Sequence, residues 1–318
     1  MKRVIKMMLL VLITIIISGC SKGRTKKIGI LIYDKEDTFM QEYLSELTKK
    51  IDQKSNFKYE VYFAGKNQLL QNKQFLEFYN EDYDLIIVNA VDRLSSYAMI
   101  EKAEVKDIPL IFINREPQAV LSNSKNSYYV GSNSLQIGVL QAELVKQMLD
   151  TNDLTDINDD GVVQIVILKG EQSHQDAENR TAEVINGLKD LGINYEILTI
   201  SIGNWERNQV YLKADELFSE YDNVELVISN NDDMALGIID YLEEKEFIVA
   251  PKIIGVDGTV AGLEAIANNK MYGTVVNDYL EQVRTIDILI DYLLKGVILK
   301  DFDYDNRFQL INGKIIHN

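Results

Sequence analysis

The sequence has few of the residues that most often carry chemistry. Its 318 residues include one cysteine, Cys20, and two histidines, His174 and His317. A zinc site built on several histidines is therefore excluded, and the chain cannot form a disulfide within itself. The phosphate-binding patterns GxGxxG and GxxxxGK are absent. Pairs of carboxylates arise by chance among 49 acidic residues, so no pair stands out as a glycosidase site. The sequence predicts a protein that is not an enzyme.

Positive charge is also scarce. Lysine and arginine number 33 against 49 acidic residues, which gives a formal net charge of −16. So acidic a chain argues against nucleic acid as a partner and against non-specific adhesion to anionic lipid. Its length is enough for two domains of ordinary size.

The N-terminus has the marks of a secretory leader. Three basic residues, Lys2, Arg3 and Lys6, precede an apolar run over residues 7–17 that is too short to span a bilayer as a mature helix. Ser18-Gly19-Cys20 then resembles the bacterial lipobox, in which the cysteine is lipidated and becomes the new N-terminus. We therefore expect a signal peptide over residues 1–19, lipidation of Cys20 and a polar tether over residues 20–27. The alternative is an uncleaved membrane anchor; either way, the domain lies outside the cytoplasmic membrane.

Strand-like and helix-like segments alternate along the rest of the chain. Runs rich in Ile and Val predict strands at 28–33, 59–63, 84–88, 109–113, 163–168, 195–200, 224–229, 252–256 and 272–276. Helical periodicity lies between them, among other places at 40–52, 94–104, 134–149, 177–191, 206–220, 233–246 and 278–295. This alternation predicts an α/β protein with parallel sheets covered by helices on both faces. The strand signal weakens over 114–162, so we place a domain boundary near 109–117.

Polar side chains follow most of the predicted strands, where ligands bind in open α/β sheets. They are Asp37, Asn89, Asn114, Arg115, His174, Asp176, Asn231, Asp232, Asp257 and Asn277. Such donors and acceptors suit a neutral polyhydroxyl ligand, and Phe39 and Trp205 could stack on its apolar faces. The alternative is that these polar residues cap helices and that the aromatic residues belong to the core.

An acidic stretch has the spacing of a calcium loop. Oxygen-bearing side chains occupy positions 1, 3, 5 and 9 (Asp156, Asn158, Asp160 and Gln164), with Gly161 at position 6. Position 7, Val162, would contribute its carbonyl oxygen. Position 12, a glutamate in an EF-hand, is Ile167, within a predicted strand. The stretch is either a calcium loop that lacks one carboxylate or an acidic surface turn.

Several motifs together resemble one known family. They are Ile28–Tyr33 with Asp37 and Phe39, the Asn89 turn, Phe112–Pro117, Tyr128–Gly131, Leu168–Glu171, His174–Arg180, Val227–Asp232, Gly255–Asp257 and Gly273–Asp278. From about Lys27 to Ile316 the chain resembles the bacterial extracytoplasmic glucose/galactose-binding proteins of ABC transporters. That family has the type I periplasmic-binding-protein fold.

The resemblance implies two doubly wound parallel-sheet lobes joined by a hinge, with the ligand in the cleft between them. It assigns residues 28–111 and 278–318 to an N-terminal lobe and residues 112–277 to a C-terminal lobe. The sugar-binding residues that it implies are Asp37, Phe39, Asn89, His174, Asp176, Arg180, Trp205, Asn231, Asp257 and Asn277. It also implies structural Ca²⁺ held by Asp156, Asn158, Asp160, Val162 and Gln164, with Glu225 as the missing carboxylate.

By this resemblance the protein is a monomer that captures galactose or glucose, with methyl-galactoside as a further ligand, and delivers it to a membrane permease. An alternative is a sugar sensor that docks on a chemoreceptor or histidine kinase. Another is a binding protein for a different polyol. The resemblance also places the start of the family's third interdomain crossing near Asn318. We therefore expect either a hinge with fewer strands or a C-terminal lobe that lacks an edge element.

Overall fold

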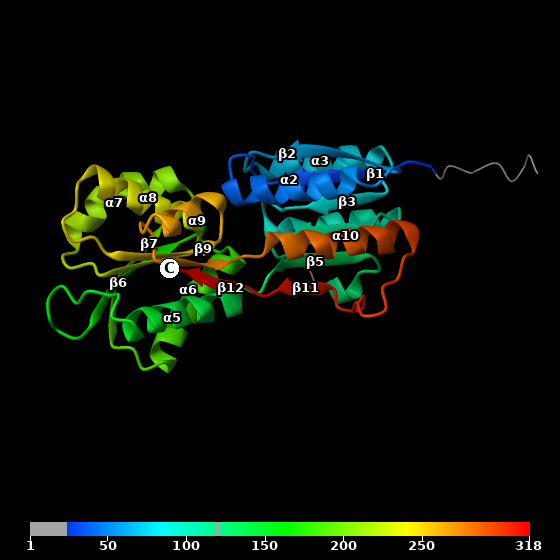
Figure 1. Ribbon diagram of the computed structural model, residues 1–318. Helices are drawn as coiled ribbons and strands as arrows, with labels where there is room; N and C mark the ends of the chain where they lie inside the picture. The colour runs from blue at the N-terminus through cyan, green and yellow to red at the C-terminus, as the bar shows by residue number, and fades with distance from the viewer. Residues whose placement is uncertain (1–23, 119–120) are drawn as a thin grey trace, which may run out of the picture.

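Strands that are apolar on both faces form the centres of two lobes (Figure 1). The computed structural model describes residues 24–118 and 121–318. Every residue of β3 (Leu85–Val88) and of β6 (Val163–Lys169) is buried. Such strands require helices on both faces of the sheet, because either face would otherwise expose apolar side chains to water.

The first sheet has six parallel strands in the order β11-β5-β4-β3-β1-β2. Besides β3, its strands are β1 (Lys26–Ile32), β2 (Phe57–Phe63), β4 (Leu110–Ile113), β5 (Ser127–Ser132) and β11 (Phe308–Ile311). Helices α2 (Thr38–Asp52) and α10 (Tyr279–Lys295) cover one face, and α3 (Gln68–Asn80) and α4 (Ser96–Val105) cover the other. Two short 3₁₀ turns, Arg93–Ser95 and Leu121–Asn123, lie in the connections.

The second sheet has the order β12-β10-β9-β8-β6-β7, and only the edge strand β12 is antiparallel to its neighbour. Besides β6, its strands are β7 (Tyr195–Ile202), β8 (Leu226–Ser229), β9 (Lys252–Asp257), β10 (Gly273–Val276) and β12 (Lys314–His317). One face carries α5 (Ser134–Asp150) and α6 (Gln175–Asp190). The other carries α7 (Arg207–Glu220), α8 (Asp232–Glu244) and α9 (Val260–Ala267).

The chain crosses between the lobes three times, between β5 and α5, between β10 and α10, and between β11 and β12. The crossings lie side by side, since Asn133 Nδ2 donates to Asn312 Oδ1 at 2.9 Å and Gly313 N donates to Gln136 Oε1 at 2.8 Å. The third crossing is complete within the described residues. The expectation that the chain stops where this crossing begins is therefore wrong.

The lobe boundaries expected from the sequence also need correction. Strand β5 pairs with β4, so residues 112–132 belong to the first sheet and not to the second. Strand β12 pairs with β10, so the last residues join the second sheet. The expected tether is shorter at its end, because Lys26 already starts β1. The expected signal peptide and Cys20 lie outside the described residues.

All nine strands and all seven helices expected from the sequence are present, with ends shifted by a few residues. Strands β5, β11 and β12 are additional to the predicted strands, and helices α3 and α9 are not among the helical segments named above. Within residues 24–118 and 121–318, no helix has the length and apolar character needed to cross a bilayer.

Candidate ligand-binding site

The carboxyl ends of strands from both sheets meet around one polar hollow. Its lining residues are Tyr33, Asp37, Phe39, Asn114, Arg115, His174, Asp176, Arg180, Trp205, Asn231, Asp257 and Asn277. Nine of the ten expected site residues are among them. The hollow bears charged, amide and aromatic groups from both lobes.

Several of these side chains also cap helices, so the two interpretations of the polar ring are compatible. Asp37 caps α2 by accepting from Met40 N at 2.8 Å, and its other oxygen accepts from the Tyr33 hydroxyl. Asn231 caps α8 by accepting from Met234 N at 3.1 Å. An ionised carboxylate has about four acceptor positions, so Asp37 retains capacity for a ligand hydroxyl. Capping holds these side chains at the rim of the hollow in fixed orientations.

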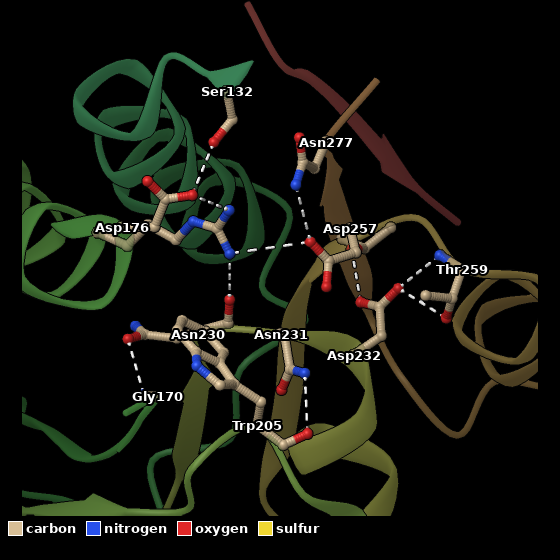
Figure 2. A network of polar contacts seen from close by, with 12 residues as sticks. Ser132, Gly170, Asp176, Trp205, Asn230, Asn231, Asp232, Asp257, Thr259 and Asn277 are labelled. Carbon is tan, nitrogen blue, oxygen red and sulfur yellow. Dashed lines mark hydrogen bonds and ion pairs between the residues drawn. The ribbon is translucent and has the colours of Figure 1, made fainter. Parts of the chain in front are cut away.

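A buried charged group forms one wall of the hollow (Figure 2). Arg180 donates to Asp176 Oδ2 at 3.2 Å and to the carbonyl of Asn230 at 2.8 Å, and it lies 3.8 Å from Asp257 Oδ1. Ser132 Oγ donates to Asp176 at 2.9 Å, and Asn277 Nδ2 donates to Asp257 at 3.3 Å. Arg180 Nε has no hydrogen-bond partner among the described atoms. These charges are desolvated, which is costly unless further hydrogen bonds reach them.

Burial shifts the proton affinities in this wall. It raises the pKa of Asp257 well above its usual range, and the nearby Asp232 adds to this while Arg180 opposes it. Burial, with Arg115 and Arg180 nearby, lowers the pKa of His174 well below its usual range. His174 is therefore neutral near pH 7. Its Nδ1 accepts from Asp176 N at 3.2 Å, so the proton is on Nε2, a potential donor.

Two aromatic side chains complete the lining. Phe39 projects from the first turn of α2 and meets Tyr279 edge-on, with ring centroids 6.0 Å apart. Trp205 lies in the loop between β7 and α7 at φ +70°, and its ring meets His174 at 5.1 Å. A Cβ on Gly170 would lie 2.2 Å from the Trp205 ring, so only glycine allows this approach. Aromatic faces beside polar groups suit a ligand with both C–H faces and hydroxyl edges.

Asn89 differs from the expectation, because it does not line the hollow. Its side chain is fully buried and makes structural hydrogen bonds to Tyr33 N, to the Ile113 carbonyl and to the Asn114 side chain. It therefore holds the ends of β1, β3 and β4 together.

Tyr33, Asn114 and Arg115 line the hollow but are not among the sugar-binding residues that the resemblance implies. Asn114 and Arg115 do belong to the polar residues that follow predicted strands, whereas Tyr33 gives no signal beyond its place at a strand end.

Direct contacts between the lobes close the cleft. Arg115 donates to Glu171 at 2.6 Å, and Lys66 contacts both Asp34 of its own lobe and Glu206 of the other. The guanidinium of Arg115 also stacks 3.8 Å from the Tyr33 ring centroid. The arrangement described is therefore a closed one.

The acidic loop of the second lobe contacts Glu225, the carboxylate that the resemblance adds to the ligands of the loop. Glu225 is buried and accepts from Ile157 N at 2.5 Å and from Gln164 N at 3.4 Å. The pKa of Glu225 is raised above its usual value, chiefly by burial. The two hydrogen bonds oppose this increase, and the nearby Asp156 and Asp160 add to it. In the described part of the chain, no three carboxylate, histidine or cysteine side chains converge into a metal cluster by themselves. Any ion here would also need amide and carbonyl oxygens.

Comparison with known proteins agrees with this architecture. The family model described as "Periplasmic binding protein domain" matches residues 28–296. The chain is 32% identical over 282 residues to the D-galactose/methyl-galactoside binding periplasmic protein MglB of Haemophilus influenzae, covering 88% of this chain and 85% of that protein.

Two solved structures share the fold. An ABC transporter solute binding protein from Bacillus halodurans C-125 with bound myo-inositol matches at a TM-score of 0.79 and 24% identity, over 94% of this chain and 96% of that one. The fructose binding periplasmic domain of the hybrid two component system BT1754 matches at a TM-score of 0.76 and 19% identity, over 92% and 90%.

Proposed function

The chain belongs to the family described as the periplasmic binding protein domain, and we propose that it captures D-galactose or D-glucose. The family consists of extracytoplasmic binding proteins and not of enzymes. Delivery of the sugar to an ABC permease follows from the proposed role. The observation that carries the proposal is the buried group of Asp176, Arg180 and Asp257 beside Phe39 and Trp205.

This lining matches the surface of a pyranose. Neighbouring carboxylates and a guanidinium can accept from and donate to adjacent hydroxyls, while the two aromatic residues contact the ring faces. Asp37 is proposed to bind the 4-hydroxyl, where a carboxylate can accept from either epimer, so both galactose and glucose should bind. A sugar that lacks a hydroxyl would leave buried polar groups unpaired and would be rejected.

Sugar binding is proposed to shift the protein from an open form to the closed one. The hollow takes residues from both lobes, so a ligand touches all of them only when the cleft is shut. The ion pairs Arg115–Glu171 and Lys66–Glu206 form only in the closed arrangement and add to its stability. Micromolar affinity, about −8 kcal/mol, would be ordinary for such a site.

We propose that the protein is held to the outer face of the membrane by lipid on Cys20, as a monomer. The support is the sequence: basic residues, a short apolar run and Ser18-Gly19 before the only cysteine. Stable anchoring of this kind needs two or more acyl chains.

A structural Ca²⁺ is proposed for the acidic loop of the second lobe. The proposed ligands are Asp156, Asn158, Asp160, the Val162 carbonyl, Gln164 and Glu225. Gln164 Oε1 is buried without a hydrogen-bond partner among the described atoms, which suits a cation ligand. Burial raises the pKa of Glu225, and the nearby carboxylates Asp156 and Asp160 raise it further; a cation between these groups would favour their charged forms. The ion would tie the loop to β8 and perform no chemistry.

A second candidate function is sugar sensing by docking on a receptor or kinase. The fold occurs in the periplasmic domain of a two component system, which favours keeping this alternative. Both roles use the same closed form, so the structure of the binding protein does not distinguish them. Genes for a transporter beside the gene for this protein would favour the transport role.

A thermal-shift panel tests the binding proposal. Galactose and glucose should raise the unfolding midpoint, and ribose, fructose and myo-inositol should not. The panel is repeated with a calcium chelator, which separates the effect of metal removal on the unfolding midpoint from the effect of sugar binding. A shift with myo-inositol alone would identify a different polyol as the ligand.

A further inference from the structure

The connection between α10 and β11 exposes three consecutive aliphatic residues. Val297, Ile298 and Leu299 are 43%, 71% and 47% exposed. Gly296, directly before these residues, ends α10 in the left-handed conformation at φ +67°. Lys295 and Lys300 lie on either side of this segment in the sequence. We call residues 297–299 the apolar turn. Contiguous exposed apolar residues of this kind often mark an interaction surface.

The apolar turn is held in place by the residues that follow it. Tyr304 contacts Tyr292 with ring centroids 4.1 Å apart and the rings tilted by 32°, and it packs, with Phe302, against the core of the first lobe. The backbone N–H of Leu299 donates to the Tyr304 hydroxyl at 3.0 Å, and Phe302 N donates to the Leu299 carbonyl. The connection therefore partly buries its aromatic residues and leaves its aliphatic ones exposed.

The apolar turn lies at the end of the lobe where the chain enters the structure. Arg24, the first described residue, pairs with Asp84, and it lines the same hollow as Leu293 and Leu294 near the end of α10. Figure 1 shows the start of β1 at the same end of the first lobe as the end of α10. Val105, at the end of α4, is 77% exposed and precedes Lys106, which lines this hollow too.

The length of chain before Arg24 limits how far this end can be from a membrane. Cys20 precedes Arg24 by four residues, which span roughly 14 Å when fully extended. If lipid on Cys20 sits in a bilayer, the end of the lobe that carries the apolar turn is held at the membrane surface. This step rests on the lipid anchor proposed above.

We propose that the apolar turn docks in the interface of the bilayer and orients the binding protein on the membrane. Interfacial binding scales with the apolar area that is buried, and lysines beside that area reach the headgroups through their long stems. The chain as a whole is strongly acidic. Docking is therefore expected to depend on the aliphatic side chains and to occur on zwitterionic phosphatidylcholine vesicles.

A site-specific fluorophore tests this proposal in the full-length lipidated protein. Lipid blocks the thiol of Cys20, the only native cysteine, so Ile298→Cys provides a single site for a polarity-sensitive dye. The matched control is Ile248→Cys, since Ile248 is 100% exposed and lies in the other lobe. On phosphatidylcholine vesicles, dye at 298 should shift to the blue and be quenched by brominated acyl chains, and dye at 248 should do neither. Adding Leu299→Asp to the Ile298→Cys protein should abolish both effects.

Each outcome bears on one claim. Co-flotation of the protein with vesicles, measured in the same samples, reports the lipid anchor. If the protein floats but the dyes at 298 and 248 behave alike, docking is wrong and the anchor stands. If it does not float, the anchor is wrong. A blue shift at 298 without vesicles would mean that another part of the chain or a second copy covers the apolar turn, which overturns membrane docking.

Discussion

Single residues in the binding wall are charged and buried, and this makes their roles measurable. Asp176 and Arg180 are each about 3% exposed and paired with one another, and Asp257 lies on the other side of Arg180. Removing one charge leaves its partner buried with fewer hydrogen bonds. Loss of such a group should therefore affect ligand affinity far more than loss of an exposed charge on the same helix.

Asp176→Asn keeps the shape of the side chain but removes its charge. Hydrogen bonds to charged groups contribute about 1.5–3 kcal/mol, so galactose affinity should fall roughly 10- to 100-fold. Asp190→Asn, at the exposed end of α6, is the control and should leave affinity unchanged. Calorimetric titration of both variants measures this, and unchanged binding by Asp176→Asn would contradict the site assignment.

Asp232 makes folding sensitive to pH. It is fully buried behind Asp257, accepts from Thr259 N at 2.8 Å and from Thr274 Oγ1 at 2.7 Å, and burial raises its pKa to about 7. Between about pH 4 and pH 7 the folded protein keeps a proton that the unfolded chain releases, so this group lowers stability as pH rises through that window.

Asp232→Asn should remove this dependence. Relative to the variant, the wild type should lose stability from pH 5 to pH 8, as measured by denaturant unfolding at each pH. Asp222→Asn, which replaces an exposed aspartate of the same lobe, is the control. An equal pH dependence in wild type and Asp232→Asn would show that Asp232 ionises normally.

The sequence predicted which residues lie near the binding site, but it did not predict where each side chain points. A polar residue after a parallel strand lies at the correct edge of the sheet whichever way it points, which explains why nine expected residues gather in the hollow. Asn89 occupies such a position but points into the backbone of neighbouring strands. Its role, like that of Tyr33, depends on tertiary packing that no local pattern encodes.

At the scale of elements, the loop after β7 places Trp205 through a close approach to Gly170. Gly170→Ala should push the Trp205 ring away and weaken sugar binding several-fold, because the added Cβ meets the ring and not a flexible chain end. Gly187→Ala, which meets the Cβ of Ala142 between α5 and α6, is the control for overpacking. Both variants should lose stability, but only Gly170→Ala should lose affinity. Equal affinities in titration would mean that Trp205 does not contact the ligand.

The acidic loop over residues 156–164 joins two distant segments of the second lobe, because Glu225 accepts from Ile157 N. If it binds Ca²⁺, the ion at 100 times its dissociation constant should stabilise this lobe by about 2.7 kcal/mol, and a chelator should lower its melting temperature. Glu225→Gln should lose most of this response, whereas Glu220→Gln at the exposed end of α7 should keep it. Melting curves with and without chelator decide this. A chelator response that Glu225→Gln retains would remove Glu225 from the ligand set.

The buried central strands were predictable and the peripheral ones were not. Strands such as β3 and β8 are apolar throughout because helices cover both faces. Strands β11 and β12 lie at sheet edges and have no fully buried residue, so they give little apolar signal. Strand β5 begins and ends with serine, and its burial comes from its place between β4 and β11. Missing β5 also displaced the predicted lobe boundary.

At the scale of the whole molecule, the two lobes meet around the ligand through residues that neither lobe could bring together alone. Three adjacent crossings allow the lobes to move about a hinge, and ion pairs at the cleft mouth favour the closed form. The Lys66–Glu206 pair is exposed and contributes at most about 1 kcal/mol, whereas Arg115 of the other pair is buried. We expect the sugar to supply the rest of the free energy of closure. The specificity of the protein therefore resides in the hollow and not in the contacts around it.

Calorimetric titration with D-galactose, D-glucose, D-ribose and myo-inositol tests the central claim most directly. The account predicts micromolar or tighter binding of galactose and glucose with one ligand per chain, and no measurable binding of ribose or myo-inositol. Tight binding of myo-inositol or ribose with no heat from either hexose would contradict it.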